Sequence, residues 1–284
     1  MNLQHLETLI NNALQEDIGS GDYSTLCCIE PTKKGKAVLK IKQDCVLAGV
    51  EIAKQIFHQA EPTTIFQQYK NDGEKVVFGE TAFEVEASIH TILKCERLVL
   101  NTMQRMSGIA TLTAVYADRI KQYKTKLLDT RKTTPNFRLL EKEAVRIGGG
   151  TNHRFGLYDM IMLKDNHIDY CVGIEKAIDK AFQYVQDNKL NIKIEVETRT
   201  IDDVKKVCNA GIGKVDRLML DNFSPAQITE ALKIINHQFE TEASGGITID
   251  NIETYAATGV DFISVGALIH QAKSVDLSLK AVIS

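Results

Sequence analysis

The chain has 284 residues, of which 44% are hydrophobic and 25% charged, and its formal net charge is −3 at pH 7. This is the composition of a folded globular protein, so a disordered, collagen-like or low-complexity chain is excluded. A general attraction to nucleic acid or to an anionic membrane surface is excluded as well, because the whole molecule is weakly negative.

The N-terminal segment carries a helical pattern rather than a targeting signal. Apolar residues recur over 3–14 at helical spacing, and no basic segment precedes an apolar core as in a secretory signal. No stretch approaches the roughly 18 apolar residues that a bilayer span requires. The six cysteines form no C-x-x-C pair and no zinc-finger spacing. We therefore expect a soluble cytoplasmic protein with reduced thiols.

The first third of the chain is predicted to form an antiparallel sheet that is covered on one side. Segments 36–42 and 83–87 alternate between apolar and polar residues, which is typical of strands with one buried face. A helix is expected over 50–59, between these strands. A second helical pattern starts near residue 90 and continues to about 110, with an interruption expected at Gly108. This helix is interpreted as the join between two domains.

From about residue 125, short strands alternate with helical patterns. Repeated units of this kind fold as a doubly wound sheet or as a barrel. Six strands are fewer than the eight of a complete barrel, so an incomplete or modified barrel is preferred. The predicted strands are Lys126–Asp129, Tyr158–Lys164, Asn191–Thr198, Asp216–Asn222, Phe239–Ala243 and Asp261–Val265.

Chemically active side chains follow these strands at the point where each strand ends. Cations follow the first two strands, carboxylates the next two, and glycine-rich turns the last two. The carboxyl ends of barrel strands meet at one face, so we expect these groups to form one site. The alternative is that polar residues simply begin wherever a strand stops. That alternative explains any single strand but not the sorting by residue type.

The cations of this group are Arg131, Lys132, His153, Arg154 and Lys164. Residues 131–164 contain seven Lys or Arg against three acids, in a protein of negative net charge. Since an arginine can form two parallel hydrogen bonds to a carboxylate or a phosphate, the group predicts a multiply charged anionic substrate. Three further cations of the stretch are assigned to a solvated helix face, namely Arg138, Lys142 and Arg146.

The later strand ends predict oxygen ligands and phosphate-binding turns. Glu197 and Asp221 suit Mg²⁺ or the hydroxyls of a ribose, although helix capping or salt bridges would also explain two acids. Turns 244–246 and 264–266 contain glycine, which lets backbone N–H groups approach phosphate oxygens closely. The glycine run 148–150 is interpreted as a flexible loop that presents His153 and Arg154 to a ligand.

Together these segments resemble the quinolinate phosphoribosyltransferases, the carboxylating nicotinate-nucleotide pyrophosphorylases of the type II phosphoribosyltransferase family. The most specific segment is LLDTRKTTPNFRLLEKEAVRIGGGTNHRFGLYDMIMLKDNH, residues 127–167. The resemblance continues through EDIGSGDYST (16–25), ERLVLNTMQRMSGIAT (96–111), EVET (195–198), LMLDNFSP (218–225), EASGGIT (242–248) and ISVGALI (263–269). It therefore spans nearly the whole chain.

The resemblance implies an N-terminal open-faced α/β sandwich over 1–110 and an incomplete, seven-stranded α/β barrel over 111–270. The tail 271–284 is expected to pack back on the first domain. The resemblance further implies a homodimer with shared active sites and leaves higher assembly open. It implies transfer of phosphoribosyl from phosphoribosyl pyrophosphate to quinolinate with decarboxylation, giving nicotinate mononucleotide, pyrophosphate and CO₂ for NAD biosynthesis. Mg²⁺ and no organic cofactor are implied for this reaction.

The same resemblance assigns roles to individual residues. Lys164, Glu197 and Asp221 are implied to be catalytic, and the two acids to hold Mg²⁺ with the substrate. Substrate binding is implied for the same three residues and for Arg131, Lys132, His153, Arg154 and an Arg97 supplied by the other subunit. Binding of the 5′-phosphate is implied for Ser244, Gly245, Gly246, Ser264 and Gly266.

Three alternatives stay open from the residues themselves. Lys164 could instead be the Schiff-base nucleophile of a barrel lyase. The chain could be a non-catalytic sensor of a phosphorylated ligand, although a sensor does not need paired carboxylates beside cations. It could also act on nicotinate or another aromatic acid, whereas the many cations favour a diacid. His167 is left outside the site, and the cysteines have no assigned role.

Overall fold

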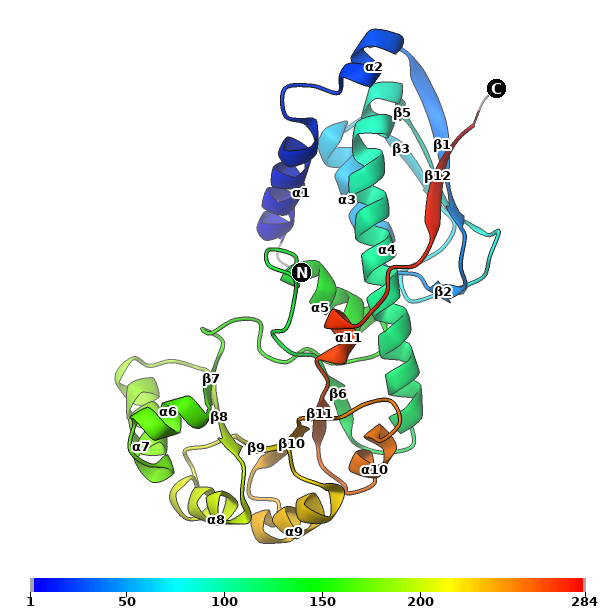
Figure 1. The fold of residues 1–284 in the computed structure, drawn as a ribbon. Coiled ribbons are helices and arrows are strands. Elements are labelled where there is room, and N and C mark those ends of the chain that lie inside the picture. Colours follow the sequence, from blue (N-terminus) through cyan, green and yellow to red (C-terminus); the bar gives the residue numbers. More distant parts are fainter. Residues whose placement is uncertain (1–2, 283–284) are drawn as a thin grey trace. The chain divides into compact units, whose positions relative to one another are not determined.

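The computed structural model describes residues 3–282, and Figure 1 labels their helices and strands. The chain divides into two compact units. Unit 1 contains the residues up to 114, 133–149 and those from 268 on, whereas unit 2 contains 115–132 and 150–267. Segment 133–149, expected in the barrel domain, thus belongs to unit 1. Among the described residues, no helix is long and apolar enough to cross a membrane.

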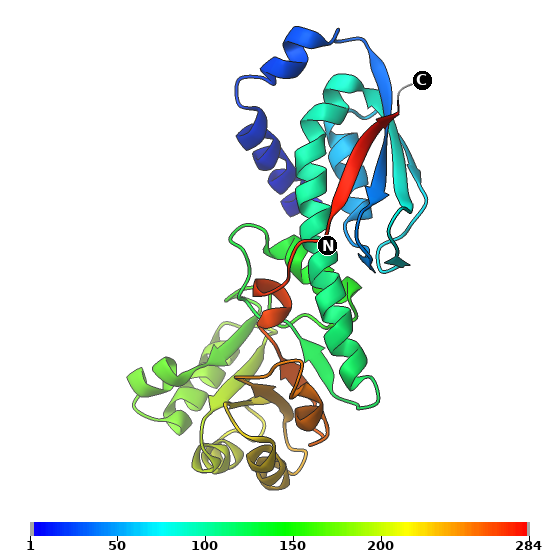
Figure 2. The same cartoon turned by 45° about the vertical axis from the view of Figure 1, so that its right-hand side comes forward.

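Unit 1 is built on a four-stranded antiparallel sheet with the order β12-β1-β5-β3. Ala37, Leu39 and Ile41 of β1 are fully buried and alternate with more exposed residues, as the sequence pattern predicts. Helices α3 and α4 lie on one side of this sheet (Figure 2). The strands of unit 1 are β1 (Lys34–Ile41), β2 (Cys45–Val46), β3 (Ile65–Gln68), β4 (Lys75–Val76), β5 (Thr81–Ser88) and β12 (Leu277–Val282). This is the predicted open-faced α/β sandwich.

The helices of unit 1 begin with α1 (Leu3–Ile18), α2 (Tyr23–Cys28) and α3 (Val50–Ala60). They continue with α4 (Ile89–Ile120), α5 (Arg138–Ile147) and α11 (Ala267–His270). Helix α4 is one uninterrupted helix, so the break predicted at Gly108 is wrong. A β-carbon at Gly108 would lie 2.0 Å from the carbonyl oxygen of Lys273. The glycine therefore makes room for the passing backbone.

Gly148, the first residue of the glycine run, has a comparable packing role. A β-carbon there would lie 2.4 Å from the carbonyl oxygen of Ala110 on α4. The absence of a side chain lets the C-terminal end of α5 approach α4 closely. This residue of the predicted flexible loop is thus fixed against a helix within unit 1.

Arg105 connects α4, α5 and the C-terminal segment within unit 1. Its Nε donates to Oε1 of Glu141 at 2.9 Å, while Nη1 and Nη2 donate to the carbonyl oxygens of Ala272 and Ile269 at 2.7 and 2.8 Å. Glu141 is fully buried and also accepts from the backbone N–H of Thr134 at 2.8 Å. The buried charge of Glu141 is therefore both paired and hydrogen-bonded, as burial of an ion requires.

The basic face predicted on α5 is only partly solvated. Arg146 is exposed, and its Nε donates to Glu143 at 3.0 Å. Arg138 is half-buried, and Lys142 is almost completely buried. The prediction of a solvated Lys142 is therefore wrong, because α5 buries a broad face that includes this residue.

Unit 2 contains a six-stranded parallel sheet with the order β6-β11-β10-β9-β8-β7. The strands are β6 (Lys126–Leu128), β7 (Met160–Leu163), β8 (Lys193–Thr198), β9 (Arg217–Asp221), β10 (Glu240–Ser244) and β11 (Phe262–Ser264). All six predicted strands are confirmed. An isolated parallel bridge joins Leu128 to Thr151 on the free edge of β6. This single residue occupies the position of the implied seventh strand.

Helices follow the strands of unit 2 and lie on the outer side of the curved sheet (Figure 1). They are α6 (Asp165–Tyr170), α7 (Ile174–Asp187), α8 (Ile201–Ala210), α9 (Pro225–Ile235) and α10 (Ile252–Ala256). Strands β8, β9 and β10 are buried along most of their length, as parallel strands covered by helices should be. The predicted incomplete α/β barrel is confirmed as the fold class of this unit.

Candidate functional site

The carboxyl ends of β8, β9 and β10 lie side by side in unit 2. Glu197 pairs with Met219, and Asp221 pairs with Ser244. Paired residues of neighbouring strands, and residues two apart on one strand, share a face of the sheet. Glu197, Asp221 and Ser244 therefore lie on the same face near the same edge. The predicted carboxylates and the first predicted phosphate turn come together in this way.

Lys164 follows β7 directly, and its side chain lies beside Glu197. The distance from Lys164 Nζ to Glu197 Oε2 is 3.9 Å. Burial raises the pKa of Glu197, and the charge of Asp221 raises it further, whereas Lys164 lowers it. The two acids are thus close enough to repel each other, which makes this edge a favourable place for positive charge.

His167 holds the start of α6 in place. Its Nδ1 accepts the backbone N–H of Lys164 at 3.0 Å, which satisfies a donor at the helix N-terminus. This contact explains the position of His167 near Lys164 without a role in binding.

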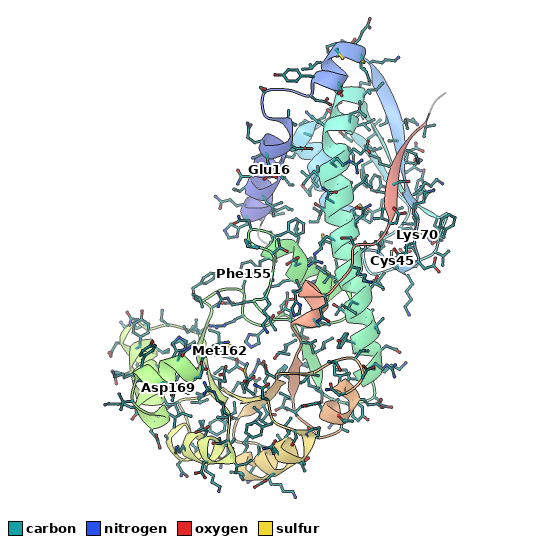
Figure 3. All side chains as sticks on the ribbon, viewed as in Figure 1. Glu16, Cys45, Lys70, Phe155, Met162 and Asp169 are labelled. Carbon is teal, nitrogen blue, oxygen red and sulfur yellow. The ribbon has the colours of Figure 1, made fainter. Side chains whose placement is uncertain are left out.

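Arg131 and Arg154 form a second group of positive charge in unit 2. Burial lowers the pKa of Arg154, and the nearby charge of Arg131 lowers it further. Nη1 of Arg154 donates to the carbonyl oxygen of Met160 at 3.1 Å, and Nη2 lies 3.6 Å from Sδ of Met162, which Figure 3 labels. Two guanidinium groups this close to each other favour binding of an anion between or beside them. Lys132 is exposed next to Arg131.

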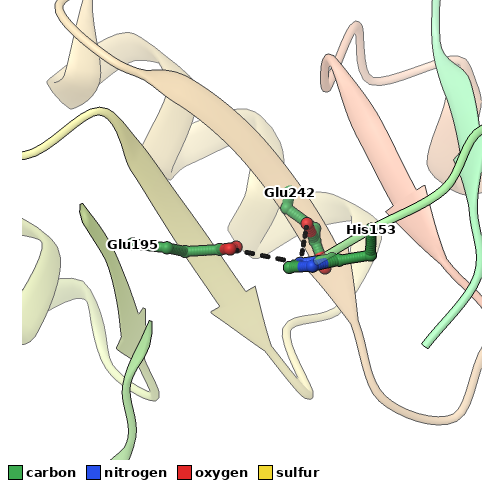
Figure 4. A group of neighbouring side chains, drawn as sticks. All are labelled: His153, Glu195 and Glu242. Atoms are coloured by element: carbon green, nitrogen blue, oxygen red, sulfur yellow. Dashed lines mark ion pairs between the residues drawn. The ribbon is translucent and has the colours of Figure 1, made fainter. Parts of the chain in front are cut away.

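His153 lies in the interior of unit 2 between two carboxylates. Its Nε2 is 3.1 Å from Oε2 of Glu195 and 3.2 Å from Oε2 of Glu242 (Figure 4). Burial would lower the pKa of His153, but the two carboxylates raise it to about 9. The imidazole is therefore directed into the protein by a charge network that the sequence analysis missed.

Arg217 extends this network across the sheet. Its Nη1 lies 3.1 Å from Oε2 of Glu242, and its guanidinium stands over the ring of Phe262 at 4.0 Å. Although burial raises the pKa of Glu242, His153 and a hydrogen bond from Ser264 hold it below the ordinary value. A signal was present in the sequence, because charged residues stand two positions apart in IEVET and ETEAS and four positions apart in RLMLD, so that they share one face of each strand.

The turn after β10 contains two glycines in the left-handed backbone conformation. Gly245 and Gly246 have φ of +90° and +62°, which side chains disfavour. Asn222 packs against this turn, and its backbone N–H donates to the carbonyl oxygen of Ser244 at 2.8 Å. Its Nδ2 donates to Oδ2 of Asp221 at 2.7 Å. Asn222, which the sequence analysis did not select, therefore joins the acidic strand end to the glycine turn.

Ser264 and Arg97 differ from the other predicted site residues, Ser264 in its contacts and Arg97 in the unit to which it belongs. Gly266 follows β11, whereas Ser264 at the end of that strand is buried and bonded to Glu242. Arg97 is exposed on α4 and belongs to unit 1. Every other predicted site residue belongs to unit 2.

Arg199 is an additional cation at the end of β8. It forms an ion pair with Asp165, and its Nε lies 4.0 Å from Oε1 of Glu197. The sequence analysis did not select it because it follows the strand by one residue and precedes a capping threonine. It adds positive charge to the edge that carries Lys164.

Comparison with known proteins agrees with this geometry. A family model described as "Quinolinate phosphoribosyl transferase, N-terminal domain" matches residues 22–107, and the corresponding C-terminal domain matches 109–280. A tobacco protein (Nicotiana tabacum) named mitochondrial quinolinate phosphoribosyltransferase [decarboxylating] 2b is 42% identical, over 97% of this chain and 82% of its own length. A Bacillus subtilis protein named probable nicotinate-nucleotide pyrophosphorylase [carboxylating] is 39% identical, over 100% of this chain and 96% of its own.

Solved structures show the same fold over the full length. The nicotinate-nucleotide pyrophosphorylase from Francisella tularensis superposes with a TM-score of 0.90 at 38% identity, covering 99% of this chain and 98% of its own. NadC from Streptococcus pyogenes gives a TM-score of 0.90 at 37% identity, covering 100% of this chain and 99% of its own. Both family models together span most of the chain. The chain belongs to the quinolinate phosphoribosyl transferase family.

Proposed function

We propose that this chain transfers the phosphoribosyl group of phosphoribosyl pyrophosphate to quinolinate with decarboxylation. The products are nicotinate mononucleotide, pyrophosphate and CO₂, and the reaction serves NAD biosynthesis. The observation that carries the proposal is the placement of Lys164 3.9 Å from Glu197, beside Asp221, at one strand edge of unit 2. Family membership and the names of the relatives support the same reaction.

Quinolinate carries two neighbouring carboxylates, which require several cations. Arg131 and Arg154 are two neighbouring guanidinium groups in unit 2, and Lys164 follows β7 of the same unit. Guanidinium groups bind carboxylates through paired, charge-assisted hydrogen bonds, each contributing about 1.5–3 kcal/mol. Lys132 and His153 belong to the same proposed substrate site. We further propose a homodimer in which Arg97 of the partner subunit completes it.

The carboxylates have the charge that the reaction needs. The ring nitrogen of quinolinate attacks C1 of phosphoribosyl pyrophosphate, the C1–O bond breaks, and pyrophosphate leaves with that electron pair. Positive charge develops at C1 and the ring oxygen of the ribose, where Glu197 and Asp221 stabilise it electrostatically. The pyridine nitrogen is then quaternary and positive, so it stabilises the electron pair that stays on the adjacent ring carbon when the carboxylate leaves as CO₂. A proton takes the place of that carboxylate.

Glu197 and Asp221 also fit a divalent cation. Both are oxygen donors at adjacent strand ends, and burial together with the charge of Asp221 raises the pKa of Glu197. A hard cation such as Mg²⁺ prefers such ligands and would relieve the repulsion between the two acids. When bound with the substrate, the ion would neutralise charge on the leaving pyrophosphate. No organic cofactor is required, since the positive ring nitrogen of the substrate itself stabilises the electron pair left by the departing CO₂.

The glycine turns are proposed to bind the 5′-phosphate. Gly245 and Gly246 both have positive φ, and Gly246 is exposed with open space around it, which suits a turn whose N–H groups bind an anion. The proposed phosphate-binding residues are Ser244, Gly245, Gly246, Ser264 and Gly266. The contact of Ser264 with Glu242 leaves its backbone as the group available for this role. The predicted cytoplasmic location stays a prediction.

One assay tests the proposal directly. The protein is incubated with quinolinate, phosphoribosyl pyrophosphate and Mg²⁺, and nicotinate mononucleotide, pyrophosphate and CO₂ are measured. Equal amounts of the three products are expected, and Arg131→Ala should abolish them while the thermal unfolding temperature stays close to that of the wild type. Nicotinate as the sole acceptor tests the monoacid alternative. Borohydride trapping of a carbonyl substrate on Lys164, with no nucleotide formed, would favour the lyase instead.

A further inference from the structure

The network around His153 occupies both nitrogens of the imidazole. Nε2 lies between the carboxylates of Glu195 and Glu242 at 3.1 and 3.2 Å. Nδ1 lies 2.6 Å from the backbone nitrogen of Arg154 and accepts its N–H when the ring is neutral with its proton on Nε2. All three network side chains are buried, with exposures of 5% for His153 and 0% for each glutamate. The polar atoms of the ring thus face protein groups rather than a ligand.

The backbone of His153 is held from another direction. Its N–H donates to Oδ1 of Asp129, a fully buried acid at the end of β6, at 2.8 Å. His153 therefore contacts Asp129 through its backbone, and Glu195 and Glu242 through its side chain. It directly precedes Arg154 in the chain. A buried residue held by ion pairs and hydrogen bonds from several directions is restricted to a single local conformation. The immediate neighbour fixed in this way is Arg154.

The network also lies directly beneath the proposed reaction centre. Glu195 precedes Glu197 by two positions on β8, and Glu242 precedes Ser244 by two positions on β10. Since alternate residues of a strand share a face, each network glutamate lies one layer below a proposed site residue. Figure 4 shows the imidazole of His153 reaching both glutamates from outside these two strands.

We propose that His153 is a positioning residue, which together with Glu195 and Glu242 fixes Arg154 for quinolinate, and does not bind the substrate through its ring nitrogens. This inference rests on the proposed function. It adds a buried layer, formed by His153, Glu195 and Glu242, beneath the proposed substrate site. It changes the role given to His153 by the family resemblance, and it adds two glutamates that no substrate atom needs to touch.

The same three side chains could be read as a metal site, since their ligand atoms all lie within 4.8 Å of one another. The guanidinium of Arg217, 3.1 Å from Glu242, already supplies positive charge to this cluster. A divalent cation would be repelled by Arg217, so the ion pairs with His153 are favoured over metal binding. Metal analysis of the purified protein checks this directly.

The test is a double-mutant cycle on the full-length protein. His153→Asn keeps an oxygen near the position of Nδ1 and removes Nε2, whereas Glu242→Gln removes the charge that Nε2 faces. Glu195→Gln is the second network variant. Glu240→Gln is the matched control, because Glu240 lies on the same strand as Glu242, pairs with Arg217 and is partly exposed. The KM values for quinolinate and for phosphoribosyl pyrophosphate are measured separately, together with kcat and thermal unfolding.

If His153 positions Arg154, Glu242→Gln and Glu195→Gln raise the KM for quinolinate by about tenfold, the size expected for one buried charge-assisted contact. The KM for phosphoribosyl pyrophosphate stays within about twofold, and the double variant His153→Asn/Glu242→Gln is no worse than the poorer single variant. Loss of folded protein alone would lower kcat and leave both KM values unchanged, so the selective change separates positioning from destabilisation.

Multiplicative effects in the cycle, or glutamate variants with the KM of the Glu240→Gln control, would overturn the inference. So would one equivalent of tightly bound metal that is lost in His153→Asn. These results are distinct from a failure of the proposed function, which would appear as a wild-type protein that forms no nicotinate mononucleotide. That last outcome would remove both proposals together.

Discussion

Asn222 stands directly against Gly245: a β-carbon at Gly245 would lie 2.2 Å from Oδ1 of Asn222 and 2.9 Å from its backbone nitrogen. Gly245 also has a φ of +90°, where other residues are strained. The turn after β10 and the turn after β9 are therefore packed against each other with no room for a methyl group. This contact joins the proposed phosphate-binding turn to the residue that holds Asp221.

Gly245→Ala should displace Asn222 and thereby weaken binding of phosphoribosyl pyrophosphate. We expect a loss of about 1–3 kcal/mol in the free energy of unfolding from overpacking, and a raised KM for this substrate. Gly246→Ala is the matched control, because it has positive φ but open space around its β-carbon. Urea unfolding and steady-state kinetics measure both effects. Equal behaviour of the two variants would show that the contact with Asn222 does not matter.

His153 should make stability depend on pH in the alkaline range. Its pKa is about 9 in the folded protein, against an ordinary value of 6.5, so the protonated form is favoured by folding. The resulting stabilisation is complete below about pH 6.5 and is lost as pH rises through about 9. Glu195 and Glu242 face Nε2 and favour the protonated ring, whereas the backbone N–H of Arg154 faces Nδ1 and favours the neutral ring.

The measurement is the free energy of unfolding of the wild type minus that of His153→Asn, between pH 6 and pH 10. This difference should fall between about pH 6.5 and pH 9 and level off above that pH. His270→Asn, which removes an exposed imidazole outside the network, is the control. A difference that does not change with pH would mean that the carboxylates do not hold a proton on His153.

Gly108→Ala should destabilise the protein although alanine normally favours a helix. In an exposed helix this change gains about 1 kcal/mol. Here the added methyl group would lie 2.0 Å from the carbonyl oxygen of Lys273, so we expect a net loss of about 1–3 kcal/mol from overpacking. Urea unfolding measures the sign. A more stable variant would mean that the segment at Lys273 moves aside without cost.

Arg97 and Lys164 should complement each other if the proposed dimer shares its sites. Arg97→Ala and Lys164→Ala are each expected to be inactive. When equal amounts exchange subunits at random, half of the dimers are hybrids, and each hybrid has one intact site. The mixture should then recover about a quarter of the wild-type activity. Native mass spectrometry confirms that hybrids form. Hybrids without activity would place Arg97 outside the site.

The sequence predicted the parallel strands well because their signal is local. Segments such as MIML and LML are apolar on both faces, and each strand ends where polar residues begin, so strand positions could be predicted within a few residues. The convergence of Glu197, Asp221 and Ser244 followed from the same rule, since strand ends of a parallel sheet share one edge.

The buried charges could not be predicted because their environment depends on register between distant segments. Glu195, Arg217 and Glu242 are ordinary charged residues in the sequence, and only the pairing of β8, β9 and β10 brings them together. Lys142 was misassigned for a similar reason: spacing along α5 does not indicate which further segments cover it. The role of Gly108 also depends on Lys273, far along the chain.

The pairing of β1 with β12 has a consequence for synthesis of the protein. Strand β12 completes the sheet of unit 1, but it lies near the C-terminus and is synthesised only after all of unit 2. During translation β1 must keep one hydrogen-bonding edge open, and the nascent sheet is exposed to wrong partners for the longest time at that edge. A fusion or deletion that delays or removes residues 277–282 would extend this interval and promote aggregation before the chain is complete.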